Sequence, residues 1–157
     1  MDGSLVDTRT VIHLLTPGDF HRFVKATAHC PPNQKVVQLL KLLAASGFAI
    51  LIVTARSRQY EALTRDWLSW YGIEFDALYM RADGDRRTDK VVKTEMLEQL
   101  LLDGFRPVVG VDDNPTIIEL WTEQEIHFHV VPGWFPGETP DDFDASELPY
   151  LDPAYTP

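Results

Sequence analysis

The sequence predicts one α/β domain with a doubly wound parallel sheet, and three observations support this fold class. With 157 residues, of which 45% are apolar, the chain is long enough to bury one core. Residues 48–54 form an apolar, β-branched segment, which is typical of a parallel strand covered by helices on both faces. Strand-like and amphipathic segments then alternate along the chain, which favours right-handed strand–helix–strand crossovers.

The elements are expected in the following order. Pro31-Pro32-Asn33 opens a helix that ends at Gly47, and the strand at 48–54 comes next. The elements expected after it are a helix at 58–71, a strand at 76–80, a helix at 88–102 capped by Thr88, a strand at 107–111, a helix at 115–125 and a strand at 126–131.

Two segments do not follow this alternation. Residues 8–30 carry an irregular apolar pattern and are predicted to form a small cap insertion above the sheet. Residues 136–157 are rich in proline and acidic residues and contain no base, so we expect an extended acidic tail there.

Composition and charge exclude several classes of protein. The formal net charge is −10, and residues 107–157 hold 11 acids and no base. A nucleic-acid partner would therefore have to be bound locally, at one of its ends, because the chain has too few basic residues for a broad basic surface. The single cysteine excludes an internal disulfide and a Cys-based zinc site. We find neither a membrane-spanning segment nor a secretory leader, which predicts a cytoplasmic protein without a membrane partner.

The residues that carry chemistry follow the predicted strands. In an open parallel sheet the ligand site lies at the carboxyl ends of the strands. Acids there can hold Mg²⁺, while a hydroxyl and a lysine can grip phosphate oxygens. The polar residues at these positions are Asp2, Thr54, Arg56, Arg81, Lys93, Asp112 and Asp113.

Each of these residues also has an ordinary explanation when it is taken alone. Asp112 and Asp113 could only cap the next helix, Lys93 could be a solvated helix position, and Thr54 could be a plain strand end. Their joint order, each after its own predicted strand, favours a site that handles phosphoryl groups.

This order resembles the haloacid dehalogenase (HAD) superfamily of phosphatases. A closer likeness is to the 3′-phosphatase domain of bacteriophage polynucleotide kinase, through residues 53–56, 81–93, 111–113 and 117–121. The likeness covers residues 1–135 and implies a HAD-like, Rossmann-like fold with Mg²⁺ as cofactor. It also implies a phosphorylated substrate, either a nucleic-acid 3′-phosphate end or a nucleotide, handled in the cytoplasm (of the host, if the protein is phage-encoded).

The resemblance also implies roles for the site residues. Asp2 would act as general acid and base and help to hold Mg²⁺ together with Asp112 and Asp113. Thr54 and Lys93 would contact the phosphate. Outside the motifs, we expect two arginines to line the entrance and hold the rest of the substrate, namely Arg56 and Arg81.

One departure from the family pattern affects activity. The family's first motif is Asp-x-Asp-Gly-Thr/Ser, and Asp2-Gly3-Ser4 matches its second half, so the nucleophilic Asp would fall one residue before Met1. Three explanations compete: an internal methionine taken as the start, a shortened chain, or a natural relic. We therefore expect residues 1–157 to be inactive or nearly so, and the alternative function is a catalytically dead phosphate- or nucleotide-binding protein.

The same departure affects the sheet. The strand that should carry the nucleophile would lie between the strands that end at Thr54 and Asp112. We expect one of three outcomes at this place: the flanking strands pair directly, another segment fills the slot, or upstream residues do so. The sequence gives no indication of the oligomeric state.

Overall fold

The computed structural model describes residues 1–16, 20–135 and 137–138, so the predicted acidic tail lies almost entirely outside the described residues. All the predicted helices and strands are present, with shifted bounds. The elements are the short helix η1 (Ile12–Leu14), α1 (Phe20–Thr27), α2 (Gln34–Ala45), β1 (Leu51–Ser57), η2 (Arg58–Tyr60), α3 (Glu61–Trp70), β2 (Ala77–Arg81), α4 (Asp89–Leu102), β3 (Val109–Asp112), α5 (Pro115–Glu123) and β4 (His127–Val130).

Asparagine caps begin two of the helices. The side chain of Asn33 accepts a hydrogen bond from the backbone N–H of Lys35 at the start of α2. Asn114 accepts one from the backbone N–H of Thr116 at the start of α5. Each cap satisfies a backbone donor that the first helical turn would leave without a partner. Thr88 precedes α4 as expected, but its side chain makes no capping hydrogen bond, so the prediction that it caps this helix is wrong in that respect.

β1 begins three residues later than the apolar run suggested. The backbone N–H of Phe48 donates to the carbonyl of Leu43 and closes the end of α2. The backbone N–H of Ile50 donates to the side chain of Asp76 at 2.7 Å. Because both donors bond outside a strand ladder, the regular strand starts only at Leu51.

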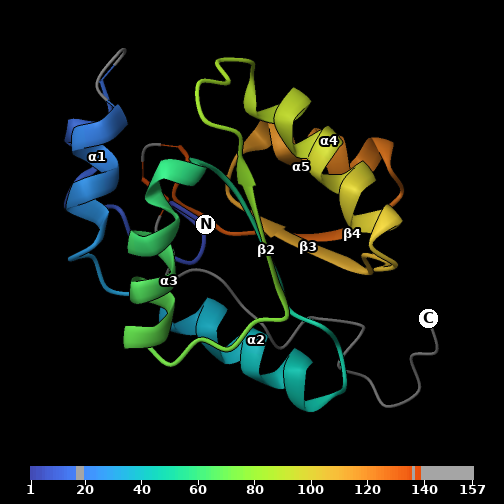
Figure 1. The fold of residues 1–157 in the computed structure, drawn as a ribbon. Coiled ribbons are helices and arrows are strands. Elements are labelled where there is room, and N and C mark those ends of the chain that lie inside the picture. The colour runs from blue at the N-terminus through green and yellow to red at the C-terminus, as the bar shows by residue number, and fades with distance from the viewer. Residues whose placement is uncertain (17–19, 136, 139–157) are drawn as a thin grey trace.

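The four strands form two parallel pairs. β1 pairs with β2, and β3 pairs with β4. Among the described residues, no ladder joins β1 to β3. The first outcome expected for the gap, direct pairing of the flanking strands, is therefore wrong. Figure 1 shows α4 and α5 together on one side of the strands, with α2 and α3 away from them.

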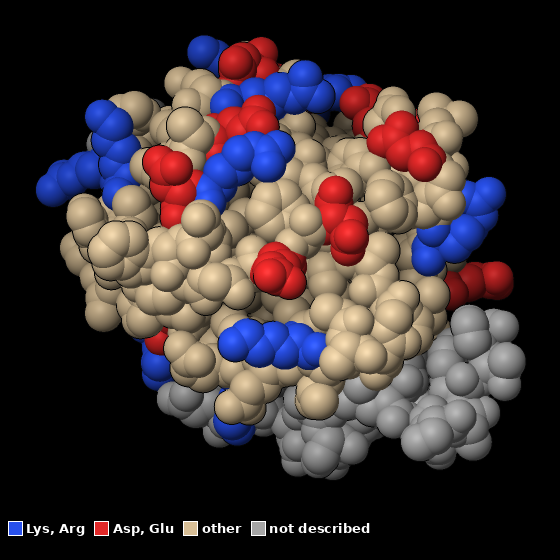
Figure 2. Space-filling view, turned by 60° about the horizontal axis from the view of Figure 1, so that its bottom comes forward, with Lys and Arg blue, Asp and Glu red and all other residues tan. Residues whose placement is uncertain are grey.

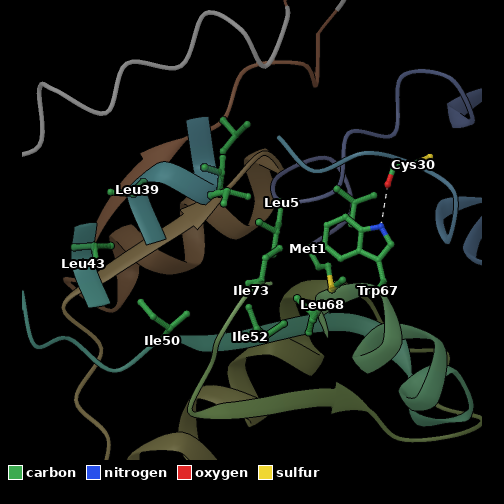
Figure 3. Packing of buried hydrophobic residues seen from close by; sticks show 14 residues of the cluster. Met1, Leu5, Cys30, Leu39, Leu43, Ile50, Ile52, Trp67, Leu68 and Ile73 are labelled. Carbon is green, nitrogen blue, oxygen red and sulfur yellow. Dashed lines mark hydrogen bonds between the residues drawn. The ribbon is translucent and has the colours of Figure 1, made fainter. Parts of the chain in front are cut away.

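The main core lies around the N-terminus and β1 (Figure 3). Leu5, Leu39 and Leu68 are among its buried members. The indole N–H of Trp67 donates to the carbonyl of Cys30 at 2.9 Å, which ties α3 to the segment before α2. A second core lies between α4, α5 and β4 and contains Leu97, Ile117, Leu120, Trp121 and Ile126.

Residues 8–30 contain η1 and α1. Phe23 and Val24 of α1 are buried against Tyr60, which anchors this segment beside η2 and α3. Within the described part of the chain, no helix has both the length and the apolar character needed to cross a membrane.

Candidate active site

A cavity of about 430 Å³ lies at the carboxyl ends of β1 and β3. Side chains from residues 8–23 also line it, including Arg9, Ile12 and Phe23, so the predicted cap segment forms part of its wall. Six of the seven predicted site residues line this cavity: Asp2, Thr54, Arg56, Lys93, Asp112 and Asp113.

The first turn of the chain brings backbone against Asp113. The backbone N–H groups of Leu5 and Val6 both donate to the carbonyl of Met1 at 2.9 Å, which closes the turn. Gly3 has φ +80°, and a Cβ at this position would lie 2.1 Å from Oδ2 of Asp113. Ser4 Oγ donates to Oδ1 of the same carboxylate at 2.6 Å. The turn therefore needs glycine both for its conformation and for space.

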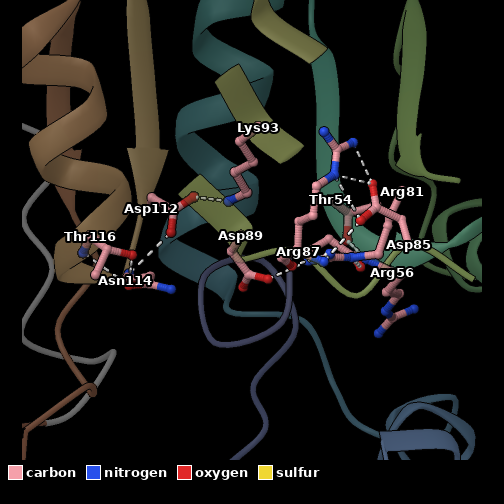
Figure 4. A network of polar contacts seen from close by, with 11 residues as sticks. Thr54, Arg56, Arg81, Asp85, Arg87, Asp89, Lys93, Asp112, Asn114 and Thr116 are labelled. Carbon is pink, nitrogen blue, oxygen red and sulfur yellow. Dashed lines mark hydrogen bonds and ion pairs between the residues drawn. The ribbon is translucent and has the colours of Figure 1, made fainter. Parts of the chain in front are cut away.

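Lys93 reaches from α4 to Asp112 at the end of β3 (Figure 4). The ammonium nitrogen donates to Asp112 Oδ2 at 2.5 Å, and the backbone N–H of Asn114 donates to Oδ1 at 3.0 Å. Both side chains are buried. Burial by itself would raise the pKa of Asp112, but Lys93 and the α-amino group of Met1 hold it below its usual value. The structure thus holds Asp112 as a charged carboxylate.

Asp113 lies in a different electrostatic environment. Burial raises the pKa of its carboxyl, although the nearby Met1 amino group and Ser4 act in the opposite direction. Two adjacent buried carboxyl groups with only partial charge compensation fit a divalent cation, because Mg²⁺ prefers such oxygen ligands. Asp112 and Asp113 are therefore the residues that could hold it.

Asp2 is bound by Arg56. Arg56 Nε donates to Asp2 Oδ2 at 2.8 Å, and Nη2 makes an ion pair with the other oxygen. The same guanidinium donates to Thr27 of α1 at 2.7 Å and to Thr64 of α3 at 3.2 Å. Among the described residues, no three acidic, imidazole or thiol groups come close enough to hold a metal ion, so Asp2 does not join Asp112 and Asp113 in this arrangement.

The two arginines differ in their relation to the cavity, because Arg56 lines it and Arg81 does not. Arg56 is only 1% exposed and sits behind Asp2, where it orients that carboxylate. Arg81 does not line the cavity: it donates to the carbonyls of Ala55 and Arg87 and pairs with Asp89. The expectation is therefore wrong for Arg81, whereas Arg56 does line the cavity, and the contact of either arginine with substrate stays a prediction.

Two groups in the site were missed by the sequence reasoning. Asp89 lines the cavity one helical turn before Lys93, and the spacing of four residues on one helix face could have indicated it. The α-amino group of Met1 also lies in the site. Burial, and then the charge of Lys93, lower the pKa of this amine.

Parallel strands with an acidic pair, a lysine and a hydroxyl at their carboxyl ends define this fold as that of a HAD phosphatase. Within that class the chain belongs to the family of the polynucleotide kinase PNKP phosphatase domain, whose family model matches residues 5–135. The HAD-like fold and the likeness to polynucleotide kinase phosphatases predicted from the motifs are confirmed.

Two solved structures share the fold. A chain of the Pnkp1/Rnl/Hen1 complex superposes with a TM-score of 0.72 at 22% identity, over 83% of this chain and 43% of that chain. A chain in a structure of the Pnkp1/Rnl/Hen1 RNA repair complex gives a TM-score of 0.68 at 23% identity, over 83% of this chain and 40% of that chain. The chain thus matches less than half the length of either.

Proposed function

We propose that this domain is a Mg²⁺-dependent phosphomonoesterase that removes phosphate from nucleic-acid 3′ ends or from nucleotides. The observation that carries the proposal is that Thr54, Lys93, Asp112 and Asp113 line the same cavity, at the carboxyl ends of β1 and β3. Membership of the polynucleotide kinase phosphatase family supports the substrate class.

The residues of the cavity have distinct tasks in this proposal. Lys93 and Thr54 bind the phosphate oxygens, and Asp112 and Asp113 hold Mg²⁺. When bound, the cation neutralises the charge of the phosphate oxygens. In its protonated form Asp2, which Arg56 orients, donates a proton to the leaving oxygen, and the carboxylate that remains later accepts one from the attacking water.

The nucleophile is an aspartate directly before Met1, in a form of the chain that carries one. Its carboxylate oxygen forms a bond to phosphorus while the ester P–O bond breaks, and the leaving oxygen takes the proton of Asp2. Water then cleaves the acyl phosphate and returns the carboxylate. Met1 lines the same cavity as Lys93 and Asp112, so a residue joined to Met1 would lie at this site.

The charge on one face of the molecule is consistent with recognition of an end rather than of a duplex. On the face shown in Figure 2, Lys and Arg lie next to Asp and Glu and do not gather into a continuous basic patch. A substrate held mainly by its terminal phosphate needs no such patch.

A second candidate function is a catalytically dead protein that binds a phosphate or nucleotide. The motif position of the nucleophile is not filled within residues 1–157, whereas Thr54, Lys93, Asp112 and Asp113 line the cavity. Such a site can bind a phosphate without turning it over.

The deciding experiment compares two forms of the protein on a 3′-phosphorylated oligonucleotide with Mg²⁺. One form is residues 1–157, and the other carries an apolar strand ending in Asp before Met1. We expect little or no phosphate release from the first and turnover by the second, which Asp2→Asn should remove. Robust turnover by residues 1–157 that Asp2→Asn abolishes would contradict the assignment of the nucleophile. No turnover by either form, with phosphate binding by both, would favour the second function.

The metal site has its own test. Calorimetry with Mg²⁺ should detect binding to residues 1–157 and none to the Asp112→Asn, Asp113→Asn double variant. Circular dichroism checks that the variant remains folded. Equal binding by both proteins would mean that Asp112 and Asp113 do not hold the cation.

A further inference from the structure

The cavity of the candidate active site has an apolar part that the phosphate chemistry does not use. Its polar side chains come mainly from the first turn of the chain and from the ends of β1 and β3, whereas several large apolar ones come from residues 12–23 and from the segment after β4. Four of these apolar side chains are exposed: Ile12, Leu15, Phe20 and Trp134. Exposed apolar side chains that gather at one polar cavity indicate a contact with a ligand, whereas scattered ones need no such explanation.

Trp134 is 50% exposed, although the backbone around it is fixed. The backbone N–H groups of Gly133 and Phe135, on either side of it, both donate to the carboxylate of Glu138 at 3.1 Å. The backbone N–H of Val131 donates to the carbonyl of Asp112 at 2.9 Å, which ties this segment to the site. A large aromatic side chain is therefore presented to the cavity by an ordered turn.

The cap segment supplies the other apolar side chains. Phe20 is 39% exposed, and its ring lies 5.7 Å from the ring of Phe23, centroid to centroid. Phe23 is buried against Tyr60, so the exposed ring rests on a packed one. Ile12 begins the short helix η1, which a hydrogen bond from the backbone N–H of Leu15 to its carbonyl closes.

This arrangement fits a ligand with a phosphate at one end and a flat apolar group at the other. Aromatic side chains stack on nucleobases, because every nucleobase has a π-face. Local charge favours a nucleic acid over an uncharged apolar group: residues 8–30 contain three basic residues and one acid, in a chain with a net charge of −10. A polyanion is therefore repelled least on the cap side of the cavity.

We propose that Ile12, Phe20 and Trp134 form a nucleobase subsite and that the substrate is a nucleotide at an unpaired strand end. The inference rests on the proposed function, because Thr54 and Lys93 must hold the phosphate for the nucleobase to reach these side chains. Stacking tolerates all four nucleobases, and the larger faces of purines should bind more tightly. An unpaired nucleobase is required, since pairing and stacking within a duplex cover its faces and edge.

The first test measures binding to residues 1–157 by calorimetry with Mg²⁺. Two ligands carry a 3′-methylenephosphonate, which cannot be hydrolysed, in place of the phosphate ester: one is the adenosine compound, and the other is the same sugar without a nucleobase. Vanadate probes the phosphate site alone. The adenosine ligand should bind at least about fivefold more tightly than the sugar ligand.

Trp134→Ala should weaken binding of the adenosine ligand at least about fivefold and change that of the sugar ligand and vanadate less than about twofold. Trp134→Phe, which keeps an aromatic face, should retain most of the affinity. Trp70→Ala is the matched control, because Trp70 of α3 is 83% exposed and does not line the cavity. It should bind all three ligands as the parent does.

Phe20→Ala tests the cap side independently of the turn around Trp134. It should show the same selectivity, with a loss for the adenosine ligand and none for vanadate. Circular dichroism checks that both alanine variants are folded. Unchanged binding of the adenosine ligand in both variants would overturn the proposal, and so would an equal loss for all three ligands, because the side chains would then support the cavity and not a nucleobase.

The parent protein separates this inference from the proposed function. Equal affinities for the two phosphonates, with vanadate still bound, would overturn the nucleobase subsite and leave the phosphate site standing. The apolar side chains would then suit a protein segment. A parent that binds neither vanadate nor either phosphonate would contradict the proposed function and this inference with it.

The second test compares two oligonucleotides with the same 3′-phosphonate at one ionic strength. One ends in an unpaired strand, and the other ends in a blunt duplex. The parent should bind the unpaired end at least about fivefold more tightly, and Trp134→Ala should reduce that preference. Equal binding of the two ends by the parent would overturn the assignment to unpaired strand ends.

Discussion

Gly3 is the residue on which the geometry of the acidic pair depends most directly. A Cβ here would lie 2.1 Å from Asp113 Oδ2, and the φ of +80° is unfavourable for any residue with a side chain. We expect Gly3→Ala to cost about 1–2 kcal/mol of stability from its backbone conformation and, in addition, to weaken Mg²⁺ binding at least about tenfold.

Gly84 offers a matched control for this prediction. Its φ is +78°, but a Cβ at this position would meet no atom of the described part of the chain within 4 Å, so Gly84→Ala carries the backbone cost without the clash. Urea denaturation and Mg²⁺ calorimetry on both variants separate the two effects. Equal Mg²⁺ affinity of the two variants would contradict the proposed role of the contact.

Lys93 is predicted to act by position and not by charge alone. It is buried against Asp112, whereas Lys90, one turn earlier, is more exposed and pairs with Glu123 at 2.7 Å. Lys93→Ala should weaken vanadate binding by at least about tenfold, and Lys90→Ala by less than about twofold, because exposed ion pairs contribute little. Similar losses in both variants, measured by equilibrium titration, would leave only bulk charge as the explanation.

At the residue scale, the sequence predicted correctly which side chains come together. It was less successful in predicting the direction in which each side chain points. Thr54, Lys93, Asp112 and Asp113 could be brought together because parallel strands end at one sheet edge. The role of Arg81 could not be predicted, since it depends on an irregularity in the register between β1 and β2. That shift falls between Thr54 and Ser57 and brings Arg81 opposite Ser57.

At the scale of elements, β3 and α5 are held close by a glycine. A Cβ on Gly110 would lie 2.7 Å from the indole nitrogen of Trp121. We expect Gly110→Ala to destabilise the domain by about 1–3 kcal/mol in urea denaturation, because a close-packed contact has no room for a methyl group.

A double-mutant cycle tests the origin of that loss. The Trp121 indole nitrogen is buried and has no hydrogen-bond partner among the described residues, so Trp121→Phe sacrifices no hydrogen bond to them. Adding Gly110→Ala to Trp121→Phe should cost less than adding it to the parent. Additive costs would place the strain elsewhere in β3.

At this scale, the residues at which helices and strands begin and end were harder to predict than the presence of these elements. Helix caps such as Asn33 and Asn114 are local signals, and the helices begin where those residues indicate. The start of β1 depends instead on a bond from Ile50 to Asp76, which is 26 positions away. Local sequence patterns do not contain that contact.

At the scale of the whole molecule, charge should tune the binding of a nucleic-acid end. Residues 139–157 contain five acids outside the described residues, and neutralising them changes the formal net charge from −10 to −5. With Asp141, Asp142, Asp144, Glu147 and Asp152 replaced by Asn or Gln, the affinity for a 3′-phosphorylated oligonucleotide should rise at low salt.

The salt dependence checks this prediction. The difference between parent and variant should shrink as ionic strength rises, because the screening length falls from about 30 Å at 0.01 M to about 10 Å at 0.1 M. Vanadate, which is small and binds inside the cavity, should show a much smaller change. A difference that persists at high salt would point to direct contacts instead of long-range repulsion.

For the architecture as a whole, the sequence predicted the alternation of strands and helices. It also predicted that β1 and β3 would not be neighbours in one sheet. Alternating strand and helix patterns predicted the parallel pairs, and the motif order predicted that β1 and β3 would flank a missing neighbour. That the two strands remain apart could not be predicted, because it depends on how well α2 and α4 resist collapse onto the space between them.

The position of Arg56 has a consequence for local unfolding. Its buried guanidinium bonds to Asp2 in the N-terminal turn, to Thr27 in α1 and to Thr64 in α3. Separating any of these segments from the others breaks a hydrogen bond of a charged group. The N-terminal turn, α1 and α3 should therefore open as one cooperative unit.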